Sequence, residues 1–517
     1  AQVLMRLIWL VTGVAFHGQV SVQPQTPLGN HLGLWVCVVP VVGGLIVGVM
    51  ARYGSRAIRG HGIPEAMEQI ILNESRIPPR ITFLKPLSAA VAIGTGGPFG
   101  AEGPIIATGG ALGSVVGQLL HTTAMERKTL LASGAAAGMA ATFGAPVSAV
   151  LLAIELLLFE FRARSIIPVA LASATAAGVR LYFEGAGAVF AMPDLHQPTG
   201  AALAMYILIG ALLGVVSAVE DAFEYLPVHW MWWPAIGGLA VGVVGYLEPR
   251  TLGVGYSNIS DMLSGNLAVT AIAGLAALKF VSWSISLGSG TSGGTLAPLF
   301  TIGGALGALL GVLLQHIFPG AGIDPRIGAL VGMAAIFAGA SRAMLASVVF
   351  AFETTLQPLG LLPLLGGCAA AFLISTLLMR NTIMTEKIAR RGVRVPAEYE
   401  ADFLDRLLVR DVASRGLVTL RTEQTIGEVR AWIASHAPGS SHQGFPVIDE
   451  RGVLHSVVTR RSLLDPSAET GARLESLAKR PPVIVYDHNT LRDAADHMVR
   501  HGIGRLPVIE ERSGRLV

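Results

Sequence analysis

The sequence contains little charge for its size. Only 14% of its 517 residues are Asp, Glu, Lys or Arg, and 52% are hydrophobic, whereas a typical soluble domain is about 25% charged. A soluble enzyme of this length needs more polar side chains to cover its surface, so that class is excluded. The charge is also unevenly placed, because residues 1–396 hold 38 charged residues and the shorter segment 397–517 holds 33. The composition indicates a membrane part followed by a soluble part.

Cysteine is nearly absent as well. The two cysteines, Cys37 and Cys368, both lie in apolar stretches, which excludes a disulfide framework and indicates buried thiols. No Cys/His cluster at ligand spacing accompanies them, so no metal site is expected. The sequence also has no basic block and no nucleophile–base motif, so we predict neither nucleic-acid binding, nor enzymatic catalysis, nor a resident cofactor.

Long apolar stretches recur through the first 396 residues. Several approach the roughly 20 residues that a straight membrane-spanning helix needs, and others are shorter and interrupted by Gly and Pro. Interrupted helices at membrane depth are tolerated where protein or a watery cavity covers the loose backbone, which is typical of transporters and channels. The longer stretches are 33–50, 167–182, 200–217, 267–287, 327–349 and 358–379, and the interrupted ones are 87–112 and 288–314.

The membrane part contains an internal repeat. Residues 94–120 align without a gap with residues 288–314, at an offset of 194, and both contain the sequence GGALG. The same offset matches the GMAA that begins at Gly138 with the one that begins at Gly332. Shared Gly/Ala-rich composition is the alternative explanation, but one common offset for two matches favours two homologous halves. Such halves predict a pathway at their interface.

Three glycine-rich turns each lead into an apolar helix with Pro near its start, at 60–65, 100–104 and 293–298. Glycine lets bare backbone approach a ligand, and the free N–H groups and positive dipole end of a helix favour an anion. Partial charges bind an anion weakly enough to release it, as conduction requires. A single turn of this kind is more often a packing device. Three turns, two of them related by the repeat, favour an anion pathway.

Glu102 is the acidic residue that stands out in this repeat, where the second half has Leu296. A carboxylate inside a membrane is costly and is by default a functional hypothesis. At an anion site it can occupy the site in place of the anion, and protonation releases it. The alternative is an idle, solvated glutamate at the membrane face. Lys279 is also intramembrane by pattern, and either attracts anions, forms a buried ion pair or snorkels to the surface.

The segment 397–517 has a different sequence pattern, which is typical of alternating strands and helices. It reads as strand, helix, strand, turn, strand and helix, and then repeats this order. The Pro-Val-Ile that begins at Pro446 corresponds to the one that begins at Pro507, and each marks a short strand before a polar turn. The second copy matches only to its second strand, so we expect it to be incomplete in this sequence.

These motifs resemble those of the CLC family of chloride channels and anion/proton exchangers. The family signatures GSGIPE, G(K/R)EGP and GxFxP, followed by a pair of CBS domains, stand here in the same order as GHGIPE, GAEGP and GTLAP, and 130–155 is also similar. The resemblance implies an α-helical polytopic membrane protein with two inverted repeats and broken helices over 1–396, plus an α/β CBS pair over 397–517. It further implies a homodimer in the lipid bilayer with one anion pathway per subunit.

The resemblance assigns roles to particular residues. It implies that Glu102 is the gating glutamate and that chloride is the transported ligand. It places the anion site at His61, Gly62, Ile63, Gly103, Thr295, Leu296 and Met384. Two of these depart from the family, since His61 replaces its usual serine and Met384 its usual tyrosine. An imidazole donates to an anion when neutral and attracts it when protonated. His61 is therefore expected either to face the pore or merely to cap its helix.

A third departure concerns protons. Coupled exchangers of the family usually carry an inner proton glutamate, and the corresponding position here is Leu156, next to Glu155. Glu155 corresponds to a neighbouring acid of the family, which favours a structural role. Glu160 lies one turn further on and is either a substitute for the missing acid or an ordinary helix-end charge, which the nearby Arg162 and Arg164 suggest. The missing acid favours a passive anion channel gated by Glu102. The alternative is a proton-coupled chloride/anion exchanger. A nucleotide sensor with a membrane anchor is a third class, which the repeat and the three helix starts disfavour.

The sequence also bears on nucleotide binding by the CBS pair and on the location of the protein. CBS domains commonly bind adenine nucleotides, but the ribose-binding Thr-x-x-Asp reads here as Thr459 to Ser462 and lacks the Asp. A dimerising or gating scaffold is therefore favoured over adenine-nucleotide binding. We expect a plasma or inner membrane protein with a cytoplasmic C-terminal domain.

Overall fold

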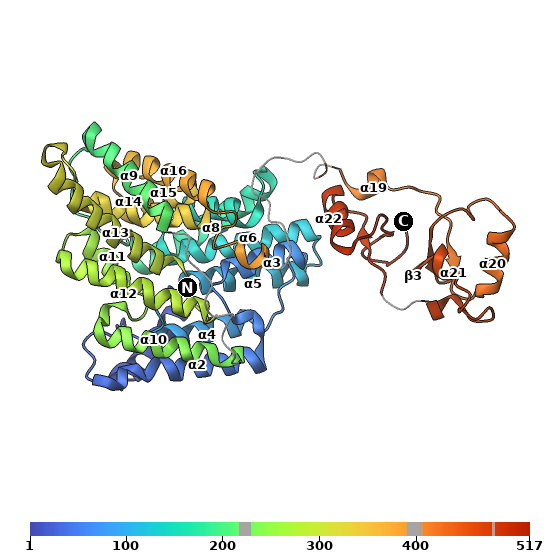
Figure 1. Cartoon of the computed structure of the whole chain (residues 1–517), viewed down its shortest axis with the longest axis horizontal. Helices are drawn as coiled ribbons and strands as arrows, with labels where there is room; N and C mark the ends of the chain where they lie inside the picture. Colours follow the sequence, from blue (N-terminus) through green and yellow to red (C-terminus); the bar gives the residue numbers. More distant parts are fainter. Residues whose placement is uncertain (217–228, 390–403, 405–406, 478–480) are drawn as a thin grey trace. The chain divides into compact units, whose positions relative to one another are not determined.

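The computed structural model of the chain describes residues 1–216, 229–389, 404, 407–477 and 481–517 (Figure 1). The chain divides into two compact units, Ala1–Tyr399 and Glu400–Val517. The boundary predicted between residues 396 and 397 lies outside the described residues.

The first unit consists of helices. Many are short or broken by turns, as the Gly- and Pro-interrupted sequence predicts. Their bounds are α1 Gln2–Thr12, α2 Val39–Val49, α3 Ile63–Leu72, α4 Ile81–Gly94, α5 Glu102–Leu119, α6 Ala124–Phe143, α7 Pro146–Ala153, α8 Ala163–Glu184, α9 Gly200–Val216, α10 Trp233–Leu247, α11 Tyr256–Leu263, α12 Val269–Gly288, α13 Leu296–Ile317, α14 Pro325–Ser341, α15 Met344–Thr355, α16 Leu361–Leu378 and α17 Glu386–Ala389.

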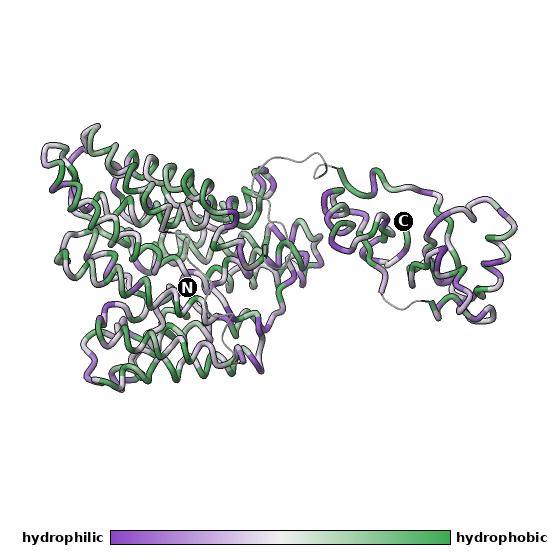
Figure 2. Tube along the Cα trace, viewed as in Figure 1, coloured by the Kyte–Doolittle hydropathy of each residue, from purple (hydrophilic) through white to green (hydrophobic). Residues whose placement is uncertain are grey.

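Six helical segments among the described residues are long and apolar enough to cross a membrane. They are Gly33–Gly54, Ala163–Glu184, Trp230–Leu247, Val269–Gly288, Leu296–Ile317 and Pro358–Leu378. Figure 2 shows that hydrophobic residues dominate the helices of this unit and that hydrophilic residues are more frequent in the C-terminal unit. The apolar stretch 327–349 is not one helix, because α14 ends at Ser341 and α15 begins at Met344. Arg342 between them has a left-handed φ of 58°, which ends a right-handed helix.

The two halves of the repeat use the same helix packing. Helices α5 and α6 pack together in the first half, and α13 and α14 in the second. A Cβ atom added at Gly109 would lie 2.2 Å from the carbonyl oxygen of Gly134, and one added at Gly303 would lie 2.4 Å from that of Gly332. Both helix pairs therefore require glycine at these contacts, because a side chain would collide with the facing backbone. In lipid, where the hydrophobic effect does not drive helices together, small residues allow the close packing that does.

The C-terminal unit contains two similar α/β motifs. Parallel strands β1 and β2 are joined by α20, and β3 pairs antiparallel with β2; in the second motif, parallel strands β4 and β5 are joined by α22. This order agrees with the prediction from the sequence. The bounds are β1 Leu420–Arg421, α20 Ile426–Ala434, β2 Gly444–Ile448, β3 Leu454–Thr459, α21 Arg460–Leu463, β4 Val485–Tyr486, α22 Leu491–His501 and β5 Val508–Ile509, preceded by α19 Val409–Val412.

Candidate functional site

The three glycine-rich turns predicted from the sequence meet in the structure. Gly100 and Gly294 exchange backbone hydrogen bonds, with N–H to oxygen distances of 2.9 and 2.8 Å. The offset between these two residues is 194, the offset of the sequence repeat, so equivalent residues of the two halves pair with each other. The turn that begins at Gly60 joins them through a bridge to Ser292, and its carbonyl accepts from the N–H of Gly293 at 3.4 Å.

Glycine is what allows these turns to approach so closely. A Cβ atom added at Gly62 would lie 2.3 Å from the carbonyl oxygen of Gly103, and one added at Gly103 would lie 2.0 Å from that of His61. Gly60 and Gly62 also have φ values of 96° and 98°, which L side chains rarely adopt. Sequence and packing together therefore place bare backbone where the two halves meet.

Glu102 lies at the centre of this arrangement. It is the first residue of α5 and is fully buried. One carboxylate oxygen accepts from the backbone N–H of Ala297, in the first turn of α13, and the other accepts from the Tyr256 hydroxyl at 2.9 Å. Thr295 and Leu296, which precede Ala297, are also buried. A carboxyl group of the protein thus occupies the positive end of a helix from the opposite half, which is where anions bind.

Sequence reasoning missed Tyr256, although a signal for it is present. The residues 253–256 read Gly-Val-Gly-Tyr and mirror Gly-His-Gly-Ile at 60–63 at an offset of 193. In the structure, α11 begins at Tyr256 as α3 begins at Ile63. The glycines of both turns have positive φ, which is 96° for Gly60, 98° for Gly62, 68° for Gly253 and 79° for Gly255. The first anion motif therefore has a counterpart in the second half.

Two buried lysines hold these equivalent turns in place. Lys279 on α12 donates to the carbonyl oxygens of Thr251 and Gly253 at 2.8 and 3.0 Å. Lys85 on α4, 194 residues earlier, donates in the same way to two carbonyls of the turn before α3, at 2.9 and 2.7 Å. Lys279 is fully buried and interacts electrostatically with Glu102. Of the expectations for Lys279, the structure excludes snorkelling to the surface.

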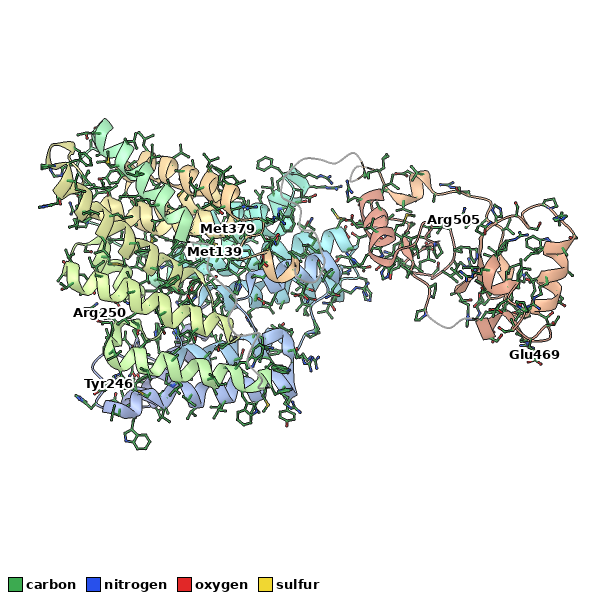
Figure 3. The ribbon with its side chains drawn as sticks, in the orientation of Figure 1. Met139, Tyr246, Arg250, Met379, Glu469 and Arg505 are labelled. Atoms are coloured by element: carbon green, nitrogen blue, oxygen red, sulfur yellow. The ribbon has the colours of Figure 1, made fainter. Side chains whose placement is uncertain are left out.

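The connection from α10 to α11 is fixed by a second basic residue. Arg250, labelled in Figure 3, forms an ion pair with Asp261 at 2.9 Å and donates to Asn258 at 3.3 Å. Arg250, Asn258 and Tyr256 also line a cavity of about 240 Å³ together with residues of α1 and of the segment 24–28. Tyr256 therefore contacts both this cavity and Glu102.

The remaining residues of the predicted site lie at the start of α3 or in segments next to elements that pack against α3. Ile63 is its first residue and is fully buried, and the preceding N–H, that of Gly62, donates to Glu65 at 2.6 Å. His61 is 8% exposed. Met384, just before α17, and Leu156, in the helical turn after α7, are both buried, and α17 and that turn each pack against α3.

The chain has two carboxylates beyond Glu102 whose roles the sequence left open. Glu155, next to Leu156, accepts from two backbone N–H groups at the start of α15, at 3.1 and 3.0 Å. Glu160 forms an ion pair with Arg162 at 3.5 Å and accepts from the Ser165 hydroxyl at 2.5 Å. Both acids therefore have structural partners near the ends of helices.

Fold and site together define an α-helical membrane protein whose two halves share one carboxylate-occupied site. The family model described as voltage gated chloride channel matches residues 43–376, and the CBS domain model matches 409–469 and 474–517. The family match covers more than half of the chain, which therefore belongs to the voltage-gated chloride channel family, the CLC family, and carries CBS domains.

Individual relatives agree with this assignment. The putative chloride channel protein ClcB-like of Ralstonia nicotianae is 28% identical over 399 residues, which cover 75% of this chain and 92% of the relative. The H(+)/Cl(−) exchange transporter ClcA of Yersinia pestis is 30% identical over 361 residues, covering 66% of this chain and 74% of the relative. The crystal structure of a slow cyanobacterial Cl⁻/H⁺ antiporter covers 75% of this chain and 97% of its own, with a TM-score of 0.64 at 23% identity, and supports the fold.

Proposed function

We propose that this protein is a proton-coupled chloride exchanger in which Glu102 alternates with the transported anion. The observation that supports this proposal is the position of the Glu102 carboxylate, which is buried and accepts hydrogen bonds from Ala297 and Tyr256. A carboxylate and chloride are both monovalent anions, so donors that hold one also suit the other. The protein's own side chain then acts as a tethered competitor for the site.

The proposed cycle follows from charge. While Glu102 is ionised, it satisfies the N–H at the start of α13 and excludes a second anion through like-charge repulsion. A proton removes its charge and weakens both hydrogen bonds, so chloride takes its place at the helix start. Because the donors of the peptide backbone carry only partial charges, the bound chloride is released again when the carboxylate returns. Each swap can therefore link one proton to anion movement.

Exchange is preferred here to the passive channel that the absence of an inner proton glutamate suggests. The Yersinia pestis relative, at 30% identity, is named an exchange transporter. Channel function is the second candidate and is favoured by one observation, the buried Leu156 at the position of that glutamate. Leucine carries no proton, so an exchanger of this kind needs another route for protons to Glu102.

A liposome experiment separates the two candidates. The purified full chain is reconstituted into liposomes loaded with chloride and diluted into low-chloride buffer at equal pH, with a potassium ionophore to clamp the voltage. If the protein is an exchanger, the efflux of chloride drives protons into the liposomes, although no pH gradient has been imposed. Chloride efflux without any proton movement would show a passive channel instead.

The role of Glu102 is tested in the same liposomes. Glu102→Ala removes the competing carboxylate, so chloride flux should lose the pH dependence that this carboxylate supplies and should also lose its coupling to protons. Asp194→Asn, which removes one negative charge at an exposed position, is the matched control and should leave both properties unchanged. An unaltered pH dependence and coupling ratio in Glu102→Ala would contradict the proposed gate.

The resemblance to the family also supports a wider proposal for the assembly. We propose a homodimer in a plasma or inner membrane, with the CBS unit on the cytoplasmic side. In this unit Thr459 caps α21 by accepting from the N–H of Ser462 at 3.1 Å, and Ser462 replaces the acid that would bind a ribose. We therefore propose a scaffold role rather than adenine-nucleotide binding, and equilibrium dialysis with labelled ATP tests it.

A further inference from the structure

We infer that the Tyr256 hydroxyl is a side-chain donor of the anion site. It holds the Glu102 carboxylate in the site and donates to the anion when that carboxylate leaves. The inference rests on the proposed function, in which Glu102 yields its place to chloride. It adds a specific residue, from a turn outside the three glycine-rich motifs, that sets both the strength of the gate and the affinity for the anion.

The geometry divides the carboxylate between two donors. One oxygen of Glu102 accepts from the N–H of Ala297, and the other accepts from Tyr256 at 2.9 Å. A phenol O–H close to an ionised oxygen gives a charge-assisted hydrogen bond, which is about twice as strong as a neutral one. An anion that replaces the carboxylate meets the same two groups, one from the backbone of α13 and one from the side chain that begins α11.

The position of the hydroxyl is fixed by its surroundings. The Tyr256 ring makes edge contacts with Phe143 and Phe190, at centroid distances of 5.7 and 6.1 Å. The turn before it is held by Lys279 through the carbonyls of Thr251 and Gly253. A donor that is oriented in advance loses little entropy when an anion arrives, so it contributes more to binding than a mobile hydroxyl.

This donor also accounts for what the site otherwise lacks. The serine and tyrosine hydroxyls expected from the family are replaced by His61 and Met384. Tyr256 occupies the position in the second half that Ile63 occupies in the first. Tyr256 of the second half therefore supplies a hydroxyl next to Glu102 of the first half, where the two halves meet.

The charged and titratable groups around Glu102 determine the sign of the pH effect. Lys279 interacts with it from α12, Tyr256 donates to it from α11, and His61 belongs to the turn whose carbonyl lies against Gly103. A hydrogen bond donated to a carboxylate favours the ionised form. Loss of the hydrogen bond from Tyr256 therefore makes protonation of Glu102 easier. Transport should then begin at a higher pH.

The test compares three variants of the full chain in liposomes. Tyr256→Phe removes the hydroxyl and keeps the ring, and should move the pH of half-maximal chloride flux upward by about one unit. In the Glu102→Ala background, the same substitution should weaken chloride affinity by about tenfold, because the anion loses a donor. Tyr206→Phe, which removes another buried tyrosine hydroxyl on α9, is the matched control and should change neither quantity.

A second substitution keeps the test decisive if Tyr256→Phe folds poorly. Site-specific 3-fluorotyrosine at this position has nearly the same size but a more acidic hydroxyl, so it should shift the pH profile downward. An unchanged pH profile and unchanged chloride affinity in these variants would overturn the inference. A Glu102→Ala protein that keeps its normal pH dependence would instead overturn the proposed function on which the inference rests.

Discussion

Glu155 and Glu353 each cap the helical segment that carries the other. Glu155 follows α7 and accepts from the N–H groups of Leu345 and Ala346 in α15, at 3.1 and 3.0 Å. Glu353 lies on α15 and accepts from the two corresponding N–H groups of α7, at 3.0 and 2.8 Å. The spacing is 198 residues for the acceptors and for the donors alike. A reciprocal arrangement of this kind is what a two-fold relation between the halves requires.

The two capping glutamates should contribute equally to stability. Glu155→Ala and Glu353→Ala each leave two N–H groups of a helix start without a carboxylate, which should lower the free energy of unfolding by about 1–2 kcal/mol. Thermal unfolding in detergent measures both effects. Loss of stability in one variant alone would show that the contacts are not equivalent, and normal proton coupling in Glu155→Ala would place this acid outside the proton route.

The two equivalent lysines should differ in function although they have similar contacts. Lys85→Met and Lys279→Met each leave two carbonyls without their donor, and each unsatisfied buried group costs about 1–3 kcal/mol. Lys279 also interacts with Glu102, and a nearby positive charge favours the ionised carboxylate. We therefore expect Lys279→Met to move half-maximal flux to higher pH. A shift of the same size in Lys85→Met would indicate a general structural effect.

His61 should add a pH dependence of its own if its imidazole faces the anion. An imidazole attracts an anion more strongly when it is protonated. The chloride current should therefore rise as the pH falls, and His61→Ser should remove that component. His196→Ser, at an exposed position, is the control. Identical pH curves for His61→Ser and the unaltered protein would exclude a pore role.

The glycine contacts between the turns predict strong intolerance to a single methyl group. Gly103→Ala would bring a Cβ atom to 2.0 Å from the carbonyl oxygen of His61, so transport should be lost or the protein should fail to fold. Gly178→Ala on α8 is the matched control, since nothing lies within 4 Å of the added atom. It should be neutral or stabilising by about 1 kcal/mol, because alanine favours the helix. Chloride flux and unfolding temperature measure both variants.

Local sequence patterns were sufficient to predict most of the helices, turns and strands. The apolar stretches, the repeat and the glycine-rich turns are read along the chain, because helix length and turn conformation depend mostly on neighbouring residues. The α/β order of the C-terminal unit followed in the same way from alternating apolar strands and polar turns. The break within the stretch 327–349 was not predicted, because it occurs at Arg342, a non-glycine residue in a left-handed conformation.

The amino-acid sequence by itself determined the membrane class, the duplication and the candidate Glu102, because these follow from composition and from a fixed offset of 194 residues. Only the tertiary structure decided what contacts that carboxylate. Tyr256 is 154 residues from Glu102 and Ala297 is 195, and no local rule brings them together. Packing of one half against the other does so, since glycine backbones at Gly100 and Gly294 allow the two helix starts to meet.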